Sequence, residues 1–273
     1  MASASVHTEY VNVGGTIRSF LARPQQAGAY PAVVLLHERY GLFQHTLDLA
    51  ERFALEGYVC IAPDLYWRVK DEATRASLLA GDISIPLPDP QVGEDVGVCL
   101  DYLKDLPSVD RARLGVMGVC LTGRYPITVG AHRADLRALV VFYGGAQERE
   151  WEVNENQPDA YADLFPRLRA PVLGVFGERD HVVPVPWVRE FRNHLEQANQ
   201  SHEVTIYRDM PHGWLNDQMP GRYRPRGAAL AWRQLMDFLE RAFGDGYPAD
   251  RVQARFESDI ATDYDPAKNV RFE

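Results

Sequence analysis

The feature that most constrains the fold of this chain is a short apolar run that ends at a cysteine framed by glycines. Residues 114–124 read LGVMGVCLTGR, and Cys120 stands between Gly118 and Gly123. The pattern Gly-x-Cys-x-x-Gly is a thiol variant of the nucleophile elbow, in which small residues allow a strained turn between a buried strand and a helix. It predicts that the side chain of Cys120 projects from the edge of a sheet into a cleft.

A thiol at the start of a helix is easier to deprotonate than a free thiol. The unpaired N–H groups and the positive end of the helix dipole stabilise the thiolate, and the same N–H groups can bind an oxyanion. The alternative is that Cys120 is a small buried hydrophobic residue, since free cysteines are among the most buried residues in proteins. The other motifs of the chain decide between these interpretations.

The composition is that of a soluble globular protein. Of the 273 residues, 46% are hydrophobic and 25% are charged, which is ordinary for folded domains. The 29 Lys and Arg residues against 38 Asp and Glu residues give a formal net charge of -9, which disfavours nucleic acid and anionic membranes as partners. The N-terminus lacks a signal-peptide pattern, and no segment approaches the roughly 20 apolar residues of a membrane span, so we expect a cytoplasmic protein.

The three cysteines, Cys60, Cys99 and Cys120, lie far apart in the sequence. Their number is odd and their spacing is not that of metal ligands, so neither a disulfide framework nor a zinc site is expected. A reducing compartment would keep Cys120 available as a thiol. We expect no metal and no cofactor.

Buried apolar runs alternate with helical patterns, and this alternation predicts a doubly wound, mostly parallel sheet flanked by helices. An antiparallel hairpin over residues 6–13 and 17–22 is expected at the N-terminal edge of the sheet. The expected strands cover residues 31–37, 58–63, 114–119, 138–143, 171–176 and 203–207. The expected helices run from 47 to the glycine at 57 and over 92–106, 187–198 and 228–243.

No repeat or linker divides the chain, so we expect one domain over residues 1–273. Its core covers about 30–243, and a polar tail over 244–273 has no place indicated by the sequence. The charged and Pro-rich segment 64–90 is too irregular for a core element and is expected to form one wall of a pocket.

The acidic segment 144–169 follows the carboxyl end of a strand, where ligands bind in such sheets. It contains three aromatic side chains, Trp151, Tyr161 and Phe165. We interpret the segment as part of a cap that brings these rings to the cleft mouth, and a solvated loop is the alternative.

A thiol nucleophile needs a base to accept its proton and a third group to orient that base. In this architecture the three follow one another as nucleophile, acid and histidine. Asp180 follows one buried strand and His212 follows the last one, so both are expected at the same sheet edge as Cys120. Glu178 or His181 could take one of these two roles instead.

These motifs resemble those of the dienelactone hydrolase family, which has the α/β-hydrolase fold. The resemblance runs from about residue 30 to 243, and its most specific part is the Cys elbow together with the Glu after the first buried strand. The matching segments are HERYGL at 37–42, APDLY at 62–66, GVCL at 118–121, GERD at 177–180 and PHG at 211–213.

The resemblance implies that Cys120 is the nucleophile, His212 the base and Asp180 the group that orients it. It also implies that Glu38 is an acidic partner of the resting thiol. The pair His37-Glu38 could suggest a zinc-binding helix, but no second His stands at the required spacing. No Ser lies in a Gly-x-Ser-x-Gly setting either, which excludes a serine esterase of this type.

The resemblance further places an oxyanion hole at the backbone N–H groups of Arg39 and Leu121. Two residues depart from the family pattern. Thr122 stands where Gly is usual and is expected to narrow the space beside the nucleophile, and Pro126 is expected to delay or kink the helix that follows the elbow. Three further side chains are candidates for contact with the substrate: Arg68, Trp214 and Arg222.

We therefore predict a hydrolase that cleaves small-molecule carboxylic esters or lactones through an acyl-Cys intermediate. The alternatives are a thioesterase or acyltransferase with the same triad, and a non-catalytic binding or sensor protein that retains the fold. The resemblance implies that arginines bind the substrate carboxylate, one of them soon after the catalytic His. No Arg lies between His212 and Arg222, so we expect neutral esters to be preferred.

Overall fold

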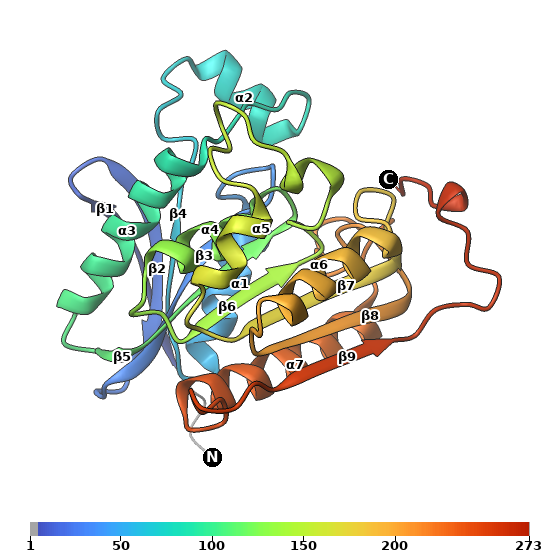
Figure 1. Ribbon diagram of the computed structural model, residues 1–273. Helices are drawn as coiled ribbons and strands as arrows, with labels where there is room; N and C mark the ends of the chain where they lie inside the picture. The colour runs from blue at the N-terminus through green and yellow to red at the C-terminus, as the bar shows by residue number, and fades with distance from the viewer. Residues whose placement is uncertain (1–4, 273) are drawn as a thin grey trace.

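A nine-stranded sheet forms the centre of the computed structural model, which describes residues 5–272 (Figure 1). Its strand order is β1-β2-β4-β3-β5-β6-β7-β8-β9. β1 (Val6–Val13) and β2 (Ile17–Pro24) form an antiparallel hairpin, β2 pairs antiparallel with β4, and the other pairs are parallel. The remaining strands are β3 (Tyr30–Leu36), β4 (Val59–Pro63), β5 (Val109–Val119), β6 (Ala138–Phe142), β7 (Val172–Arg179), β8 (His202–Pro211) and β9 (Ala254–Ser258). This confirms the predicted α/β-hydrolase fold with its edge hairpin.

Helices cover both faces of the sheet. α1 (Gln44–Leu55) and α7 (Pro225–Phe243) pack on one face, and α3 (Asp89–Asp105), α4 (Tyr125–His132) and α6 (Val185–Gln197) pack on the other. Side chains of a strand alternate between the two faces, so strands covered on both sides are apolar throughout. This explains why the central strands could be recognised as continuous apolar runs.

The segment 64–90 is more regular than its sequence suggests. It contains α2 (Glu72–Ala80), whose Leu78 is fully buried. The side chain of Asp71 accepts a 2.7 Å hydrogen bond from the N–H of Thr74 and caps the helix start. The expectation of no core element here was wrong, because this local cap and one buried leucine suffice to dock a short helix.

The proline-rich stretch that follows α2 leads directly into α3. Pro88 occupies the N-cap position of this helix, and Pro90 lies in its first turn. A proline is tolerated there because the first N–H groups of a helix have no acceptor within it. α3 therefore begins at Asp89 rather than at residue 92.

The aromatic residues of segment 144–169 do not reach a cleft. Tyr161 and Phe165 are fully buried, and both rings contact Phe191 of α6. Trp151 stacks near Trp187, also on α6, with ring centroids 5.5 Å apart. The expectation that these rings line the cleft mouth was wrong, because their apolar surface is buried against α6.

The C-terminal segment, which the sequence did not place, is part of the sheet. β9 pairs in parallel with β8, from His202 opposite Ala254 to Ile206 opposite Ser258. The chain then loops outward and returns to the carboxyl ends of β7 and β8 (Figure 1). Between residues 5 and 272, no helix is both long and apolar enough to cross a lipid bilayer. The expected absence of a signal peptide concerns the N-terminus, and residues 1–4 lie outside the described part.

Candidate active site

The predicted elbow is present at the end of β5. Cys120 has a φ of 55°, a left-handed conformation that costs a non-glycine residue about 1 to 3 kcal/mol. Gly118 is required on steric grounds, because a Cβ atom there would lie 2.2 Å from the carbonyl oxygen of Thr122. The turn leaves Cys120 half-buried at the sheet edge.

The two departures from the family pattern are accommodated within the elbow. The Thr122 side chain is buried; its hydroxyl donates to the carbonyl of Leu36 at 3.1 Å and accepts from the N–H of Val119 at 3.0 Å. It therefore ties β3 to β5 and does not line the pocket of Cys120, contrary to expectation. Pro126 lies in the first turn of α4, where no hydrogen bond is lost. A short 3-10 turn over Cys120–Thr122 precedes the helix, so α4 begins late, at Tyr125.

Three of the predicted side chains form one chain of hydrogen bonds. The Sγ atom of Cys120 lies 3.0 Å from Nε2 of His212. Nδ1 of the same ring lies 2.9 and 3.1 Å from the two carboxylate oxygens of Asp180. The carboxylate is fully buried and also accepts from the N–H groups of Val182 at 2.7 Å and Val183 at 2.9 Å. The structure thus brings a thiol, an imidazole and a fixed carboxylate together.

The charges around His212 favour its protonated form. Burial alone would lower the pKa of this imidazole, but the Asp180 carboxylate and the Cys120 sulfur outweigh burial and hold the pKa well above the ordinary 6.5. A protonated ring between a carboxylate and a sulfur can donate hydrogen bonds to both.

Glu38 is buried beside this chain and is held by two donors that the sequence did not indicate. The hydroxyl of Tyr143 donates to Oε1 of Glu38 at 3.2 Å, and the side-chain amide of Asn216 donates to Oε2. Burial, together with the charge of Glu38, raises the pKa of Tyr143 well above its ordinary value, so the hydroxyl keeps its proton and remains a donor. Only their positions in the sequence could have indicated these residues: Tyr143 directly follows the buried strand β6, and Asn216 lies soon after His212.

The backbone at Glu38 and Arg39 is fixed by two buried rings. Nε2 of His37 accepts from the N–H of Leu65 at 3.1 Å, so its Nδ1 carries the proton and donates to the carbonyl of Glu38 at 2.6 Å. Burial lowers the pKa of His37, consistent with this neutral ring. The hydroxyl of Tyr66 donates to the carbonyl of Arg39 at 3.0 Å. The N–H of Arg39, predicted as part of an oxyanion hole, therefore belongs to a rigid loop.

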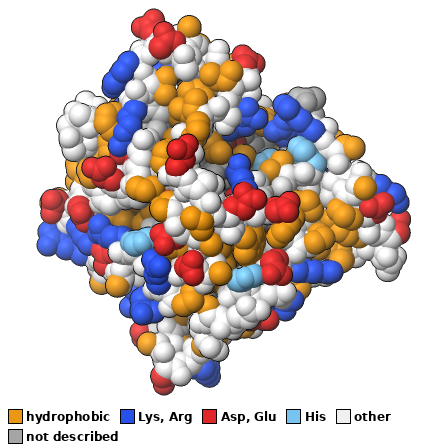
Figure 2. Space-filling view, turned by 45° about the horizontal axis from the view of Figure 1, so that its top comes forward, with side chains coloured by type: hydrophobic (Ala, Val, Ile, Leu, Met, Phe, Trp, Pro, Cys, Tyr) orange, Lys and Arg blue, Asp and Glu red, His pale blue; other side chains and the backbone are white. Residues whose placement is uncertain are grey.

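Cys120 and His212 open into a pocket of about 230 Å³. Among the described residues that line it are four arginines, whereas its lining contains one carboxylate, that of Glu38. Figure 2 shows Lys or Arg and His side chains gathered around a hollow in the upper right of the view. The four arginines supply positive charge to the pocket, although no Arg lies between His212 and Arg222 in the sequence. The lining comprises Glu38, Arg39, Tyr40, Ser84, Cys120, Leu121, Gln147, Arg149, His181, Val182, His212, Arg222 and Arg271.

Of the three candidate substrate contacts, the structure brings only Arg222 to this pocket. Arg68 instead pairs with the buried Asp95 of α3 through contacts of 2.6 and 3.0 Å. Trp214 is fully buried, and its ring contacts those of Tyr143 and Tyr207. The ion pair with Asp95 holds Arg68 at α3, and core packing buries Trp214. Neither residue is therefore retained as a substrate contact.

The two alternatives to the predicted triad are also placed. The Glu178 carboxylate accepts from the N–H groups of Asp209, at 2.9 Å, and of Ala261, so it serves the backbone rather than His212. His181 lines the pocket with its ring centroid 5.9 Å from that of His212. Neither residue has the contacts that a base or its orienting acid needs.

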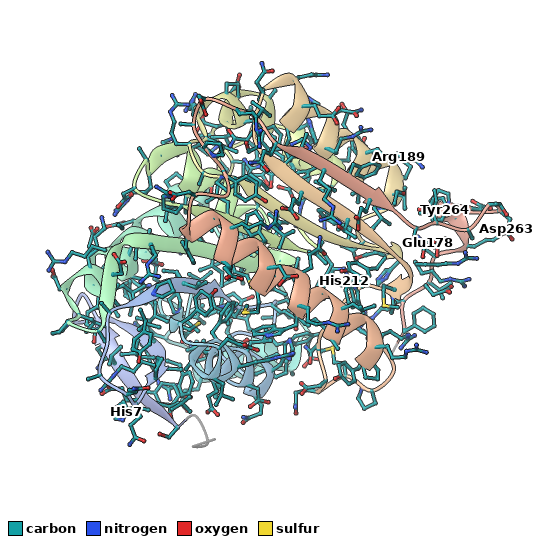
Figure 3. The ribbon with its side chains drawn as sticks, turned by 90° about the horizontal axis from the view of Figure 1, so that it is seen from below. His7, Glu178, Arg189, His212, Asp263 and Tyr264 are labelled. Atoms are coloured by element: carbon teal, nitrogen blue, oxygen red, sulfur yellow. The ribbon has the colours of Figure 1, made fainter. Side chains whose placement is uncertain are left out.

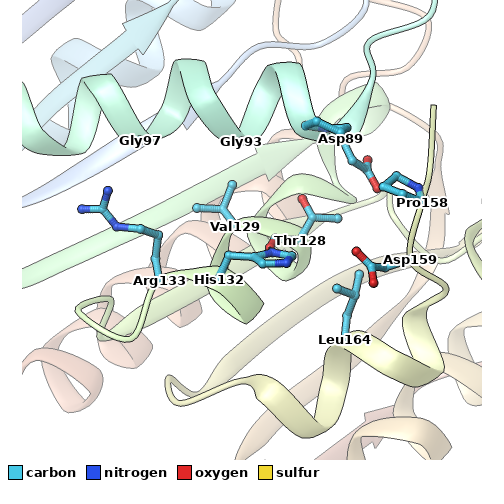
Figure 4. Close-up of a pocket in the computed structure, with 11 residues that line it drawn as sticks. Asp89, Gly93, Gly97, Thr128, Val129, His132, Arg133, Pro158, Asp159 and Leu164 are labelled. Carbon is cyan, nitrogen blue, oxygen red and sulfur yellow. The ribbon is translucent and has the colours of Figure 1, made fainter. Parts of the chain in front are cut away.

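A larger cavity, of about 410 Å³, lies between α3, α4 and the segment 158–164 (Figure 4). Gly93 and Gly97 of α3 leave it open, and Val129 and Leu164 give it apolar walls. Its lining contains neither Cys120 nor His212, so the chemistry points to the smaller pocket. Within residues 5–272, no group of three or more His, Cys, Asp or Glu side chains is arranged to hold a metal ion.

Comparison with known proteins identifies the family that the chain resembles. Residues 17–243 match the model of the dienelactone hydrolase family. A Salmonella typhimurium protein named "Putative carboxymethylenebutenolidase" is 33% identical over 244 residues, 87% of this chain and 87% of its own. A Bradyrhizobium protein named "Probable 2-oxo-3-(5-oxofuran-2-ylidene)propanoate lactonase" is 28% identical over 243 residues, 88% of this chain and 96% of its own.

Solved structures give the same result. The crystal structure of a Klebsiella pneumoniae protein, named "Putative Dienelactone Hydrolase", superimposes with a TM-score of 0.77 at 28% sequence identity. The match covers 86% of this chain and 99% of that one. Together with the family match, it shows that the chain belongs to the dienelactone hydrolase family of α/β hydrolases.

Proposed function

We propose that this protein hydrolyses small carboxylic esters or lactones, with Cys120 as the nucleophile and His212 as the base. The observation that carries the proposal is the continuous chain from the Cys120 sulfur through His212 to the buried Asp180 carboxylate. A strained cysteine with such partners at a pocket is the arrangement of an activated nucleophile. The names of two relatives specify lactones as substrates, which supports this substrate class.

In the first half of the reaction, Nε2 of His212 accepts the proton of the Cys120 thiol, and the resulting thiolate attacks the carbonyl carbon to form a tetrahedral oxyanion. The backbone N–H groups of Arg39 and Leu121 donate hydrogen bonds to this oxyanion. The imidazolium of His212 then gives its proton to the alcohol oxygen as the ester bond breaks. In a lactone this alcohol stays attached to the acyl group, and the acyl-Cys thioester remains.

In the second half, water replaces the alcohol. The neutral imidazole of His212 accepts a proton from the water as its oxygen attacks the thioester carbonyl, and the carboxylic acid leaves as the Cys120 thiolate reforms. Asp180 keeps the ring in the correct tautomer and stabilises its positive charge. Glu38 is a fixed negative charge near the thiol, and we propose that it restrains the reactivity of the resting site.

The proposal is tested with p-nitrophenyl acetate. The parent protein should release p-nitrophenol, Cys120→Ala should abolish release while keeping the melting temperature, and Cys120→Ser should retain at most weak activity. Acyltransferase activity would appear as faster release when a thiol or alcohol acceptor is added, and thioesterase activity as a higher kcat/KM for a thioester than for the matching oxygen ester. A binding or sensor protein would show no release from any ester, and hydrolysis by Cys120→Ala at the parent rate would refute the nucleophile.

We also propose a cytoplasmic location. Cys60, Cys99 and Cys120 are all free thiols in the structure. A thiol nucleophile remains active only where the surroundings keep it reduced. Fractionation of the source cells, with the protein detected by immunoblot, tests this proposal.

A further inference from the structure

The space beside the reacting groups does not end at the active-site pocket. A second cavity, of about 350 Å³, adjoins this pocket and is lined mainly by the segment 84–89 and the loop 149–157. Three residues line both spaces: Ser84, Leu121 and Arg149. This side cavity therefore begins next to the residue whose N–H is proposed to bind the oxyanion, that of Leu121.

The C-terminal segment 259–272 bounds the active-site pocket on one side and contributes to its lining. The N–H of Ala261 donates to the carboxylate of Glu178, and the N–H of Val185 donates to the hydroxyl of Tyr264 at 3.1 Å. Figure 3 shows Glu178 and Tyr264 near each other at this end of the molecule. This wall is fixed at several points, whereas the side cavity leaves space beyond the elbow.

The charged groups of the side cavity are paired with one another. Nε of Arg124, which is only 4% exposed, donates to both carboxylate oxygens of Asp89 at 3.0 and 2.9 Å. Its Nη1 donates to the Glu150 carboxylate at 3.2 Å, as does Nε of Arg149. Among the described residues of this lining, two arginines are thus balanced by two carboxylates. The side cavity therefore suits a neutral group better than a charged one.

Three side-chain amides also line the side cavity, those of Asn154, Asn156 and Gln157. The Oδ1 atom of Asn154 accepts from the N–H groups of Asn156 at 2.9 Å and Gln157 at 3.1 Å, which fixes the turn of the loop. The backbone carbonyl of Asn156 accepts a 2.8 Å hydrogen bond from the N–H of Asp89. A side-chain amide both donates and accepts hydrogen bonds, so it suits a hydroxyl group, which does the same.

Apolar side chains form another part of the wall, those of Ile85, Pro86, Leu87 and Leu121. A sugar ring carries hydroxyl groups at its edge and C–H groups on its faces, and so matches amides and apolar side chains together. Sites for small molecules combine an apolar lining with a few polar groups in the same way, and their volumes are roughly 300 to 1,000 Å³. The side cavity is thus large enough for one ring.

We propose that the side cavity is a subsite for a neutral, hydroxyl-rich ring carried by the substrate, such as a sugar. This inference rests on the proposed ester hydrolysis and names a substrate class for it: esters in which the acid or the alcohol carries such a ring. Asn156 is a specificity residue, since it contacts the ring and not the reacting carbonyl. Asn156→Ala removes its amide and keeps the backbone contacts that hold the loop.

The test uses two pairs of esters, because the ring can stand on either side of the ester bond. The alcohol side is tested with 4-acetoxyphenyl β-D-glucopyranoside beside 4-methoxyphenyl acetate. The acyl side is tested with 4-nitrophenyl (β-D-glucopyranosyloxy)acetate beside 4-nitrophenyl methoxyacetate. For each pair, the ratio of kcat/KM for the glucoside to kcat/KM for the methyl ether measures the contribution of the sugar ring. Asn156→Ala should lower this ratio about fivefold for at least one pair, the effect of one neutral hydrogen bond.

Two controls accompany this variant. Cyclohexyl ethers in place of the glucosides carry a ring without hydroxyl groups, so their ratio to the methyl ethers should change by less than about twofold in Asn156→Ala. Asn193→Ala removes a half-buried amide of α6 that lines neither space, and should leave the glucoside ratio within about twofold of the parent protein. Unchanged glucoside ratios in Asn156→Ala for both pairs would overturn the subsite, as would an equal fall for glucosides and cyclohexyl ethers.

A binding measurement separates this inference from the proposed hydrolysis. Each of the four esters is replaced by its amide, in which an N–H group takes the place of the ester oxygen. The Kd is measured by calorimetry with Cys120→Ala and with Cys120→Ala that also carries Asn156→Ala. A loss of affinity of about fivefold for one glucoside amide, but not for its methyl ether, supports the subsite even if no ester is turned over, in which case the hydrolysis alone fails. Ester turnover with no dependence of any Kd or ratio on Asn156 refutes the subsite and leaves the hydrolysis standing.

Discussion

The side-chain amide of Asn269 donates a 3.0 Å hydrogen bond to the backbone carbonyl of Asp180. The C-terminal segment therefore contacts the residue whose carboxylate orients His212, and the same amide also reaches the carbonyl of Glu178 at 3.2 Å. Within this turn, the Asp180 carboxylate accepts hydrogen bonds from the N–H groups of Val182 and Val183. Asn269 binds the backbone carbonyl of Asp180 from the C-terminal segment. This relationship makes the C-terminal segment a support of the proposed triad.

Asn269→Ala should weaken this support without removing any reacting group. We expect a loss of about 1 kcal/mol in the free energy of unfolding and a severalfold lower kcat for a neutral ester, with KM little changed. Gln253→Ala is the matched control, because its amide also donates to a backbone carbonyl, that of Gly246, on the same C-terminal region. If both variants lower kcat equally, the contact with Asp180 has no special role.

Asp180→Asn should lower kcat by about 10³- to 10⁴-fold, because the amide no longer favours the correct tautomer of His212. Glu178→Gln should act differently. It removes one of the acceptors of the Asp209 and Ala261 N–H groups, so we expect about 1 to 3 kcal/mol of lost stability and a modest loss of turnover. Chemical unfolding and steady-state kinetics of both variants check this, and a larger kinetic loss in Glu178→Gln would reassign the acid.

The pH dependence follows from the raised pKa of His212. Its value is held above the ordinary 6.5 in the folded protein, so protonation of this ring stabilises the fold fully below pH of about 6.5, and the stabilisation is lost as pH rises through the folded pKa. The contribution of the protonated ring to the melting temperature should therefore decrease as pH rises from about 6.5 through the folded pKa. In Asp180→Asn that contribution should shrink, since the main source of the raised pKa is gone. A melting profile with the same shape in both proteins would contradict this explanation.

Glu38→Gln should make Cys120 react faster with iodoacetamide in the absence of substrate. A carboxylate close to a thiol disfavours the thiolate, and the amide removes that charge while it keeps the size of the side chain. The rate is followed by mass spectrometry of the peptide that contains Cys120. Glu56→Gln serves as the control. Glu56 accepts a hydrogen bond from the indole N–H of Trp232, which packs on the face of the sheet covered by α1 and α7. An unchanged or slower alkylation in Glu38→Gln would show that its charge does not reach the thiol.

Patterns within single elements made the sheet and its edge predictable. β3, β6 and residues 114–119 of β5 are covered on both faces, so these stretches are apolar, and the residue that follows each parallel strand lies at the same edge of the sheet. Asp180 and His212 could be placed together for this reason alone. The steric demand for Gly118 at the elbow is equally local.

Contacts between distant segments set the limits of the sequence prediction. The donors to Glu38 come from Tyr143 and Asn216, which are 105 and 178 residues away, and no local pattern links such positions. β9 is a short edge strand, mostly exposed, so it lacks the alternation that marks a half-buried strand. The sequence suggested that Arg68 could contact the substrate, whereas in the structure Arg68 forms an ion pair with Asp95. The donors to Glu38, the pairing of β9 and the partner of Arg68 all depend on contacts between separate segments of the chain, and no local sequence pattern indicates them.

The most direct test of the proposed mechanism is to trap the acyl group. The parent protein is mixed with excess p-nitrophenyl acetate, quenched in acid within the first turnover and analysed by intact mass and by peptide mapping. We predict one acetyl group per chain, attached to Cys120, with a burst of p-nitrophenol of the same stoichiometry, and no adduct in Cys120→Ala. Continued hydrolysis by a protein that never carries an acetyl group on Cys120 would contradict the mechanism.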